Sequence, residues 1–476
     1  MLGKRRNVWK GPGDRESMKR ADCDLLIIGA GQAGPPLGIA LAKKGWKVAL
    51  AERKLLGGSC VNFGCTPTKA VIASARVAHL ARRARSFGVR IGSVEPDFRA
   101  VLERARGIVN QTRIGLREAL ANEKDLRIIE GHARFQGREA RAFRLKVGDE
   151  SVTARQVVID TGTRSRIPPV RGLKSIGYRT AENWLDRPDL PKHLVVLGGG
   201  YTGLEMAQFY RRMGSSVTVV EETAQIAGRE DADVSRALRS LLESEQIAFR
   251  LESRVARVEE RGDGIRLSLE RKDGRETIMA SDLFVATGRQ PNTDDLGLET
   301  IGLEPEDDGT IRVSKRLATP VRGVWAAGDI RGGPMFTHTA WDDYRILLSQ
   351  LSGDRSRTTD RIVPYAIYTD PQLGRVGLTE TEAGKTGRRV RTGRFEMRDN
   401  GKAREISETE GFIKVVSDAK SGRILGAAVL AAEAAELVHL FVDVMNAGGR
   451  ASAIRNAIHI HPTLAEAVQS AVAELE

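Results

Sequence analysis

Short apolar runs of this chain end at a repeated glycine pattern. The first run, residues 25–28, is followed by Gly-x-Gly-x-x-Gly, formed by Gly29, Gly31 and Gly34. A second apolar run, 48–51, ends at Glu52, which lies 23 residues after Gly29. A buried run that stops at closely spaced glycines predicts a strand, a tight turn and a helix. The segment therefore predicts a strand–helix–strand unit with a carboxylate after its second strand.

The same arrangement occurs a second time. Residues 194–197 form an apolar run that leads into Gly198, Gly200 and Gly203, and 217–220 lead into Glu221, again 23 residues after the first glycine. Such a loop lets backbone amides approach a pyrophosphate at the start of a helix, while the acid binds a ribose hydroxyl. Two copies predict two dinucleotides bound at once.

The acidic residues of the second copy predict which nicotinamide cofactor binds there. Glu221, with Glu222 beside it, would repel a 2′-phosphate, so we predict NADH over NADPH. Arg211 and Arg212 lie nearby in the sequence and can alter this preference. NADPH therefore stays possible.

Two late segments carry further apolar patterns. The stretch 424–445 is strongly apolar, yet Glu433, Glu436 and Asp443 exclude a membrane span. At the C-terminus, apolar residues recur at helical spacing from Leu464 to Leu475. This spacing predicts a helix with a core or interface face.

Cysteine is rare, and two of the three cysteines lie close together. Cys60 and Cys65 are five residues apart, a separation that one distorted helical turn brings within disulfide reach, roughly 4.4–6.8 Å between Cα atoms. A structural zinc needs four ligands, and no second Cys or His pair stands out. We interpret the two as a redox pair and Cys23 as a core thiol.

Composition indicates a large soluble enzyme. The 476 residues suggest three or four domains of about 100 to 150 residues. The net charge of +13 comes from arginines dispersed over predicted helices, including Arg76, Arg82, Arg83 and Arg85, which favours a solvated surface over nucleic-acid binding. The basic segment 1–21 predicts a disordered tail, and the few cysteines favour the cytoplasm.

Further motifs give the pattern a family character. These are the thiol segment 57–69 with its Cys-Thr-Pro-Thr-Lys, Asp160-Thr161-Gly162, Ala286-Thr287-Gly288-Arg289, Gly328-Asp329 and His461-Pro462-Thr463-Leu464-Ala465-Glu466. Together they resemble the pyridine nucleotide-disulfide oxidoreductase family, which includes dihydrolipoamide dehydrogenase, glutathione reductase and mercuric reductase. The resemblance runs from about Asp22 to the C-terminus.

The resemblance implies an α/β fold with two Rossmann-like domains and an α+β C-terminal domain. An FAD-binding domain would comprise 22–164 and 290–360, with an NAD(P)-binding domain, 165–289, inserted between its parts. The remaining residues, 361–476, would form the dimerisation domain of a homodimer.

The resemblance also implies roles for the site residues. Cys65 would face the flavin and Cys60 would attack the substrate. Lys69 and Glu205 would pair beneath the flavin. His461 would act as the base, with its ring oriented by Glu466, and this pair would come from the other subunit. Cofactor contacts would further involve Asp329 on the FAD ribityl chain, together with Gly58, Thr161, Gly162, Gly288, Arg289 and Gly328.

Departures from the family leave the acceptor open. No cysteine follows Cys65, and His461 stands where mercuric reductase has an aromatic residue, which argues against a dedicated mercuric reductase. We predict a dihydrolipoamide dehydrogenase-like disulfide oxidoreductase; the alternatives are a mercuric-reductase-like metal-ion reductase and a flavin redox sensor with low turnover. His338 would contact flavin or cap a helix near Trp341, and His459 is expected to be structural. Asp160 replaces the family's usual alanine without an evident reason.

Overall fold

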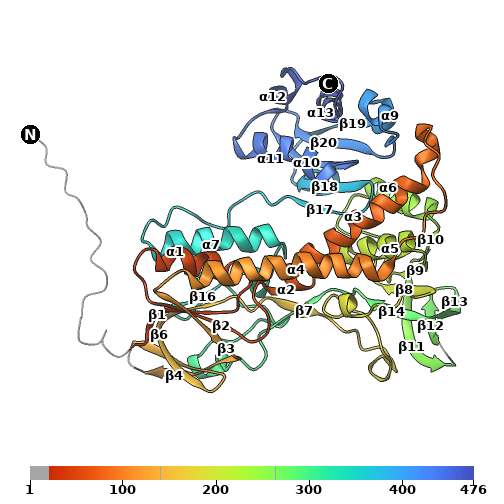
Figure 1. Ribbon diagram of the computed structural model, residues 1–476. Coiled ribbons are helices and arrows are strands. Elements are labelled where there is room, and N and C mark those ends of the chain that lie inside the picture. The colour runs from red at the N-terminus through yellow and green to blue at the C-terminus, as the bar shows by residue number, and fades with distance from the viewer. Residues whose placement is uncertain (1–20, 140, 263, 476) are drawn as a thin grey trace, which may run out of the picture. The chain divides into compact units, whose positions relative to one another are not determined.

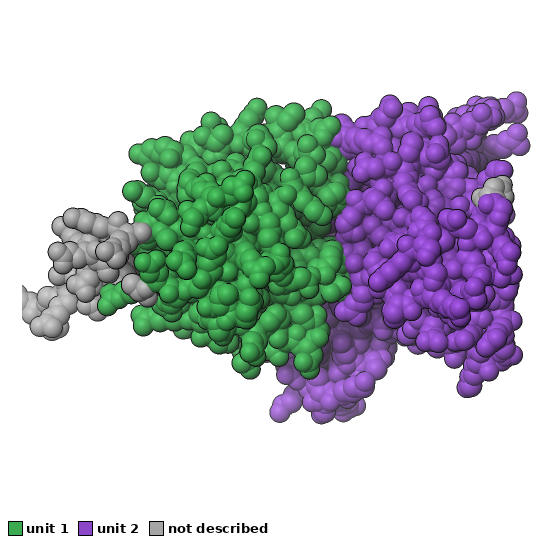
Figure 2. All heavy atoms as spheres, turned by 90° about the horizontal axis from the view of Figure 1, so that it is seen from below, with its two compact units in different colours: residues 1–64, 109–164, 289–361 green, residues 65–108, 165–288, 362–476 purple. Residues whose placement is uncertain are grey.

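The computed structural model describes residues 21–139, 141–262 and 264–475. The predicted tail lies, through residue 20, outside the described residues. Two compact units share the chain, coloured separately in Figure 2. The first unit comprises 1–64, 109–164 and 289–361, and the second comprises 65–108, 165–288 and 362–476. The predicted domain bounds remain predictions.

The first unit is built on a mixed sheet with strand order β3-β2-β1-β6-β5-β4, and β16 pairs with β6. β1, β2, β3, β6 and β16 run parallel, whereas β4 and β5 are antiparallel additions beside β6. The strands are β1 (Cys23–Ile28), β2 (Val48–Glu52), β3 (Leu126–Glu130), β4 (Ala133–Glu139), β5 (Ala142–Val147), β6 (Glu150–Ile159) and β16 (Val324–Ala326).

Helices α1 (Gly34–Ala42) and α7 (Thr337–Leu351) lie side by side on this sheet (Figure 1). Leu37 and Leu41 of α1 pack with Leu347 of α7 and with Leu25 and Leu50 of the strands below. All five side chains are buried, so α1 begins at a fixed place over the end of β1. The unit also contains α2 (Gly58–Asn62), part of α4 (Phe98–Ala121), and β15 (Arg289–Pro291), which pairs with β7 (Thr163–Ser165).

The second unit contains a parallel sheet in the order β10-β9-β8-β14. Its strands are β8 (His193–Leu197), β9 (Ser216–Val220), β10 (Ile247–Arg250) and β14 (Asp282–Val285). Helix α5 (Tyr201–Met213) follows β8, and α6 (Ala232–Ser244) precedes β10. Beside it lies an antiparallel sheet of β11 (Ser253–Arg261), β12 (Gly264–Arg271) and β13 (Gly274–Ala280).

The C-terminal part of the second unit is an antiparallel sheet with helices. Its order is β17-β18-β21-β20-β19, from β17 (Tyr365–Ile367), β18 (Gln372–Gly377), β21 (Ile424–Ala431), β20 (Phe412–Asp418) and β19 (Val390–Glu396). The helices are α8 (Glu380–Gly384), α9 (Gly401–Glu405), α10 (Ala434–Leu437), α11 (His439–Asn446), α12 (Ala451–Arg455) and α13 (Ala465–Ala473). The unit also includes α3 (Cys65–Arg82).

These elements confirm the predicted fold class. Both strand–helix–strand units form where the apolar runs predict them, and α1 accepts prolines at its first positions, where no intrahelical donor is needed. The stretch 424–445 is divided between a strand and two helices. Within residues 21–139, 141–262 and 264–475, no helix is long and apolar enough to cross a membrane.

Candidate active site

The first glycine loop closes tightly between β1 and α1. Gly29 has φ +105°, and a Cβ there would lie 2.3 Å from the Asp160 carbonyl oxygen. A Cβ on Gly34 would lie 2.5 Å from the Gly29 carbonyl oxygen. The Ala30 amide donates to Glu52 Oε2 at 2.9 Å. Only glycine permits this turn, which leaves backbone exposed to a ligand where the strand ends.

The second loop repeats this geometry between β8 and α5. Gly198 also has φ +105°, and its Cβ would lie 2.5 Å from the Ala286 carbonyl oxygen. A Cβ on Gly203 would lie 2.0 Å from the Gly198 carbonyl oxygen. The Gly199 amide donates to Glu221 Oε2 at 2.7 Å, as Ala30 does to Glu52. The carboxylate at each second strand thus fixes the loop of its own unit.

Arg211 and Arg212 have other partners. Arg211 donates to the carbonyl oxygens of Glu245 and Ser215. Arg212 is buried and pairs with Glu245 at 2.7 Å and with Asp370 at 2.6 Å. Arg212 is therefore neutralised by carboxylates, whereas Arg211, among the described residues, donates only to uncharged oxygen atoms.

The thiol segment begins against the first loop. The Gly57 amide donates to the Ala30 carbonyl oxygen at 2.8 Å, and a Cβ on Gly58 would lie 2.9 Å from the Gly31 Cα. Cys60 lies on α2 and is half-buried in the first unit. Cys65 is the first residue of α3 and of the second unit, and it is exposed. Cys23 is buried on β1 as expected, and burial raises the pKa of its thiol to about 12.

Lys69 and Glu205 form an ion pair between α3 and α5. Lys69 Nζ lies 2.8 Å from Glu205 Oε2, and the Tyr368 amide donates to Glu205 Oε1 at 2.9 Å. The side chains are 32% and 7% exposed. Burial alone would lower the pKa of Lys69, but the charges of Glu205 and Cys65 raise it overall, so Lys69 keeps its proton.

Tyr368 is a site residue that the sequence analysis did not identify. Its ring centroid lies 4.5 Å from Lys69 Nζ, which is cation–π geometry, and its amide holds Glu205. Local spacing gives no signal for this role, because the proximity of Tyr368 to Lys69 follows from the fold.

A buried charge network holds the helix that carries Cys65. Arg76 Nη1 lies 2.7 Å from Asp370 Oδ1, and Arg212 occupies the other Asp370 oxygen. Gln208 donates to the Asp370 carbonyl oxygen at 2.8 Å. The expectation of a purely solvated surface is wrong for Arg76 and for Arg83, which pairs with Glu408 at 3.3 Å. These ion pairs join α3 to α5 and to the C-terminal sheet.

Asp329 lies in a polar cluster of the first unit. Thr163 Oγ1 donates to Asp329 Oδ2 at 3.0 Å, and Arg289 Nε donates to Thr163 Oγ1 at 2.6 Å. Burial raises the pKa of Asp329, against the opposing effect of Arg289. Thr161 and Asn292 exchange hydrogen bonds at 2.9 Å. Gly162, Gly288 and Gly328, which directly follow Thr161 or precede Arg289 and Asp329, all have positive φ angles.

His461 and Glu466, which the family resemblance pairs, lie in contact. His461 Nδ1 lies 3.0 Å from Glu466 Oε1, and the Thr463 amide donates to Glu466 Oε2 at 2.8 Å. The Thr463 amide and the His461 ring hold the pKa of Glu466 below its usual range. The His461 side chain is 78% exposed, and Ile458 and Ile460 beside it are 100% and 79% exposed.

His338 lies in the first turn of α7, which begins at Thr337 and not near Trp341. Thr339 caps this helix, because its hydroxyl accepts from the Phe336 amide at 3.2 Å. The His338 ring stacks on Phe336 with centroids 5.4 Å apart. His459 is half-buried, in contrast to His461.

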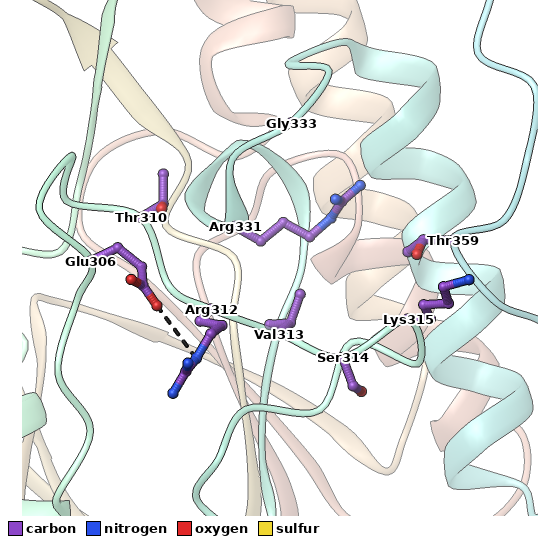
Figure 3. A pocket seen from close by; sticks show the side chains of 9 residues that line it. All are labelled: Glu306, Thr310, Arg312, Val313, Ser314, Lys315, Arg331, Gly333 and Thr359. Carbon is purple, nitrogen blue, oxygen red and sulfur yellow. Dashed lines mark ion pairs between the residues drawn. The ribbon is translucent and has the colours of Figure 1, made fainter. Parts of the chain in front are cut away.

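An open pocket of about 470 Å³ in the first unit contains none of the predicted site residues (Figure 3). Its three cations are already neutralised: Arg312 by Glu306 at 3.4 Å, Lys315 by Asp360 at 2.9 Å and Arg331 by Asp343 at 2.7 Å. It is lined by Glu306, Thr310, Arg312, Val313, Ser314, Lys315, Arg331, Gly333 and Thr359.

The two nucleotide folds, the thiol segment and the His–Glu pair define a class of nucleotide-dependent redox enzyme. Residues 23–343 match the pyridine nucleotide-disulphide oxidoreductase family, and 363–472 match that family's dimerisation domain. The chain belongs to this family of FAD-dependent oxidoreductases, in agreement with the resemblance seen in the sequence.

Several relatives match nearly the whole chain. It is 34% identical over 461 residues to dihydrolipoyl dehydrogenase of Cupriavidus necator, covering 94% of this chain and 97% of that protein. It is 32% identical over 448 residues to the probable pyridine nucleotide-disulfide oxidoreductase RclA of Escherichia coli, covering 93% and 97%. The solved Cu(II) complex of the HOCl-induced flavoprotein disulfide reductase RclA from Escherichia coli has a TM-score of 0.87 and 31% identity, covering 95% of this chain and 100% of that one.

Proposed function

We propose that the protein takes electrons from NADH and uses them, through FAD, to open a disulfide between Cys60 and Cys65. The resulting dithiol then reduces a small disulfide or related acceptor. The observation that carries the proposal is the pair of matched glycine loops, with the thiol segment packed directly on the first one. Two cofactor positions and a thiol pair are the parts that such a relay needs.

FAD fits the first loop. The Gly29, Gly31 and Gly34 turn leaves no room for a Cβ, and Glu52 lies where an acid binds a ribose hydroxyl. Asp329 and its Thr163 partner would hold the ribityl chain. Bound FAD would supply two-electron transfer between the nicotinamide and the disulfide.

NADH fits the second loop. Glu221 accepts from Gly199 through one oxygen and from the Thr223 amide through the other, at 2.7 and 2.9 Å. Its charge would repel a 2′-phosphate, and Arg211 and Arg212 are occupied elsewhere. We infer a preference for NADH.

Lys69 supplies positive charge next to the thiol that would face the flavin. Cys65 is one of the groups whose charge raises the pKa of Lys69, so the two side chains interact electrostatically. Glu205, held by the Tyr368 amide, keeps Lys69 in place.

His461 would serve as the proton carrier for Cys60 of a second copy of the chain. Its Nδ1 faces Glu466, which leaves Nε2 to take a proton from an attacking thiol. The exposed Ile458 and Ile460 flank it and would be covered in a homodimer, the assembly for which residues 363–472 carry the family's dimerisation domain. Opening the disulfide to two thiols takes up two electrons and two protons, and the His461–Glu466 pair can move a proton to or from Cys60.

Two acceptor classes remain in competition. Similarity to dihydrolipoyl dehydrogenases favours a dithiol or disulfide such as lipoamide. The Cu(II) complex of RclA motivates a metal-ion acceptor instead, bound by Cys60 and Cys65 as soft ligands. Within the described residues, no cluster of three or more His, Cys, Asp and Glu side chains is arranged to hold a metal ion. We rank the disulfide class first because the His461–Glu466 pair would serve proton transfer. We also expect the protein to act in the reducing cytoplasm.

A His461→Gln variant distinguishes the disulfide acceptors from the metal-ion acceptors. We expect His461→Gln to lower kcat for NADH-dependent lipoamide reduction on the order of 100-fold, because proton transfer is lost. The same variant should reduce Cu(II) at nearly the wild-type rate. His459→Gln is the matched control and should keep both activities. Equal losses of both activities in His461→Gln would contradict the preference for a disulfide acceptor, and a wild-type protein without NADH-dependent turnover of either would contradict the proposed function.

A further inference from the structure

A buried carboxyl group lies inside the first glycine loop. Asp160 follows β6 and is 5% exposed, and its Oδ2 accepts from the Gly34 amide at 2.8 Å. A Cβ on Gly31 would lie 3.1 Å from Oδ2, and a Cβ on Gly328 would lie 2.9 Å from Oδ1. Three glycines therefore enclose the group. One of them, Gly31, is the position at which such a loop brings its backbone close to a pyrophosphate.

The charges around Asp160 are negative or already paired. The carboxylates of Asp343 and Asp329 both disfavour a negative charge on Asp160. Asp343 is held by Arg331 at 2.7 Å and by Arg361 at 2.6 Å. The cations that act on Asp329 are Arg289 and Arg331. The remaining acid of the loop, Glu52, accepts from the Ala30 amide. Within the described chain, no Lys or Arg side chain forms an ion pair with Asp160.

An ionised carboxylate in such a place is strongly unfavourable. Burial of the charge without a cation disfavours the ionised form, and a carboxyl group in that position takes up a proton instead. Burial, reinforced by the nearby carboxylates, raises the pKa of Asp160 well above its ordinary value, although the amides of Gly34 and Ala33 oppose this. A dinucleotide pyrophosphate would add two more negative charges beside it.

The second loop supplies an internal comparison. There the residue whose carbonyl oxygen faces the first glycine is Ala286, whereas in the first loop it is Asp160. Both are followed by Thr-Gly. The backbone of such a loop therefore does not require a carboxyl group at this position, so Asp160 adds a property that the second loop lacks.

We propose that Asp160 is held as a neutral carboxylic acid in the first loop and that binding of the FAD pyrophosphate depends on its proton. The inference rests on the proposed function, in which FAD occupies this loop. Asp160 is a positioning residue: its neutral form satisfies the Gly34 amide without placing a negative charge beside the pyrophosphate. Loss of the Asp160 proton at high pH would lower the affinity of the protein for FAD.

FAD binding to the apoprotein tests this dependence without turnover. FAD is titrated into apoprotein across neutral and alkaline pH, and binding is followed by flavin fluorescence. Wild-type affinity should fall with rising pH, approaching about tenfold per pH unit between the pKa of Asp160 in the apoprotein and in the complex. Asp160→Asn keeps an acceptor for Gly34 and has no proton to lose, so its affinity should vary much less. Equal slopes in the two proteins, or a flat wild-type profile, would overturn the inference.

The apoprotein's own stability provides a second readout. Because the native-state pKa of Asp160 is raised, the folded chain binds a proton that the unfolded chain releases, so the free energy of unfolding falls as pH rises between the two pKa values. Asp160→Asn and Asp160→Ala should remove that slope. Asp24→Asn, which affects a carboxylate of the same sheet paired with Arg155 at 2.7 Å, should retain it.

The outcomes separate the inference from the function on which it rests. A wild-type protein that binds no FAD at any pH would overturn both. FAD binding with a normal affinity and no dependence on Asp160 would overturn the inference alone. If Asp160→Asn does not fold, Asp160→Ala carries the same comparison, since alanine occupies the equivalent place in the second loop.

Discussion

The two glycine loops of this chain are alike in backbone and different in what surrounds them. Each places a glycine of φ +105° against a carbonyl oxygen and fixes an amide with the acid of its second strand. The helices that follow differ. α1 carries no charged side chain, whereas α5 carries Glu205 and Arg212, both in buried ion pairs. The same nucleotide loop therefore precedes a purely packing helix in one unit and a helix with electrostatic partners in the other.

Because of this difference, we expect the first loop to serve cofactor binding alone, whereas the helix after the second loop also supports α3, which carries Cys65. The first loop has only apolar packing behind it and carries its buried carboxyl group at Asp160. The second has Ala286 there, and its helix pairs with Lys69 and, through Asp370, with Arg76 of α3. Changes that are chemically equal in the two loops should consequently produce different losses.

The largest effects are expected from one added methyl group in each loop. Gly34→Ala would collide with the Gly29 carbonyl oxygen and should abolish FAD retention, seen as loss of the flavin absorption. Gly203→Ala would collide with the Gly198 carbonyl oxygen and should retain FAD while lowering kcat/KM for NADH on the order of 100-fold. Gly115→Ala in α4 meets open space and serves as the control. Loss of flavin in Gly203→Ala but not in Gly34→Ala would reverse the assignment of the loops.

An intermediate effect is expected from the ion pair that only α5 provides. Lys69→Met leaves Glu205 charged and buried, and should lower the free energy of unfolding by about 2 kcal/mol at neutral pH, less than a fully buried pair because Lys69 is partly exposed. Since the pKa of Lys69 is raised in the folded state, this loss should persist up to about pH 10 and shrink above it. Denaturant unfolding at several pH values measures it.

Leu41→Met on α1 is the matched control for that ion pair. It conserves side-chain volume and involves no charge, so it should cost less than about 1.5 kcal/mol with no dependence on pH. An equal, pH-independent cost for Lys69→Met would show that packing and not charge holds α3 to α5.

The smallest effect concerns the acids of the two loops. Glu221→Ala should shift the ratio of kcat/KM for NADPH over NADH upward by about tenfold, which corresponds to about 1.4 kcal/mol of removed repulsion. Glu52→Ala should leave that ratio unchanged, because Glu52 belongs to the other loop. Steady-state kinetics with both nucleotides provides the test, and a preference altered by Glu52→Ala alone would contradict the assignment of NADH to the second loop.

Local sequence patterns predicted most of the fold. The roles that the sequence did not predict belong to residues whose contacts join distant segments of the chain. The apolar runs, the glycines and the acids at fixed spacing predicted both nucleotide units, because each signal lies within about 30 residues. Asp160 contacts Gly34 across 126 residues, and Arg76 contacts Asp370 across 294. No spacing rule reaches such pairs, so the sequence led us to interpret Arg76 as surface.

The candidate site divides in the same way. Both ion pairs were predicted through the family resemblance, but His461 and Glu466 lie five residues apart in one motif, whereas Lys69 and Glu205 are 136 residues apart and meet only in the fold. Tyr368 was missed, since its contact with Lys69 exists only after the segment before β18 packs beside α3 and α5.

The most direct test of the central claim is the absorption spectrum of the purified protein during anaerobic reduction by NADH. It would be recorded for wild type, Cys60→Ser and Cys65→Ser. If FAD passes electrons to the thiol pair with Cys65 facing the flavin, a long-wavelength thiolate–flavin band should form in wild type and Cys60→Ser and be absent from Cys65→Ser. A band absent from all three proteins, or one that survives in Cys65→Ser, would contradict the account.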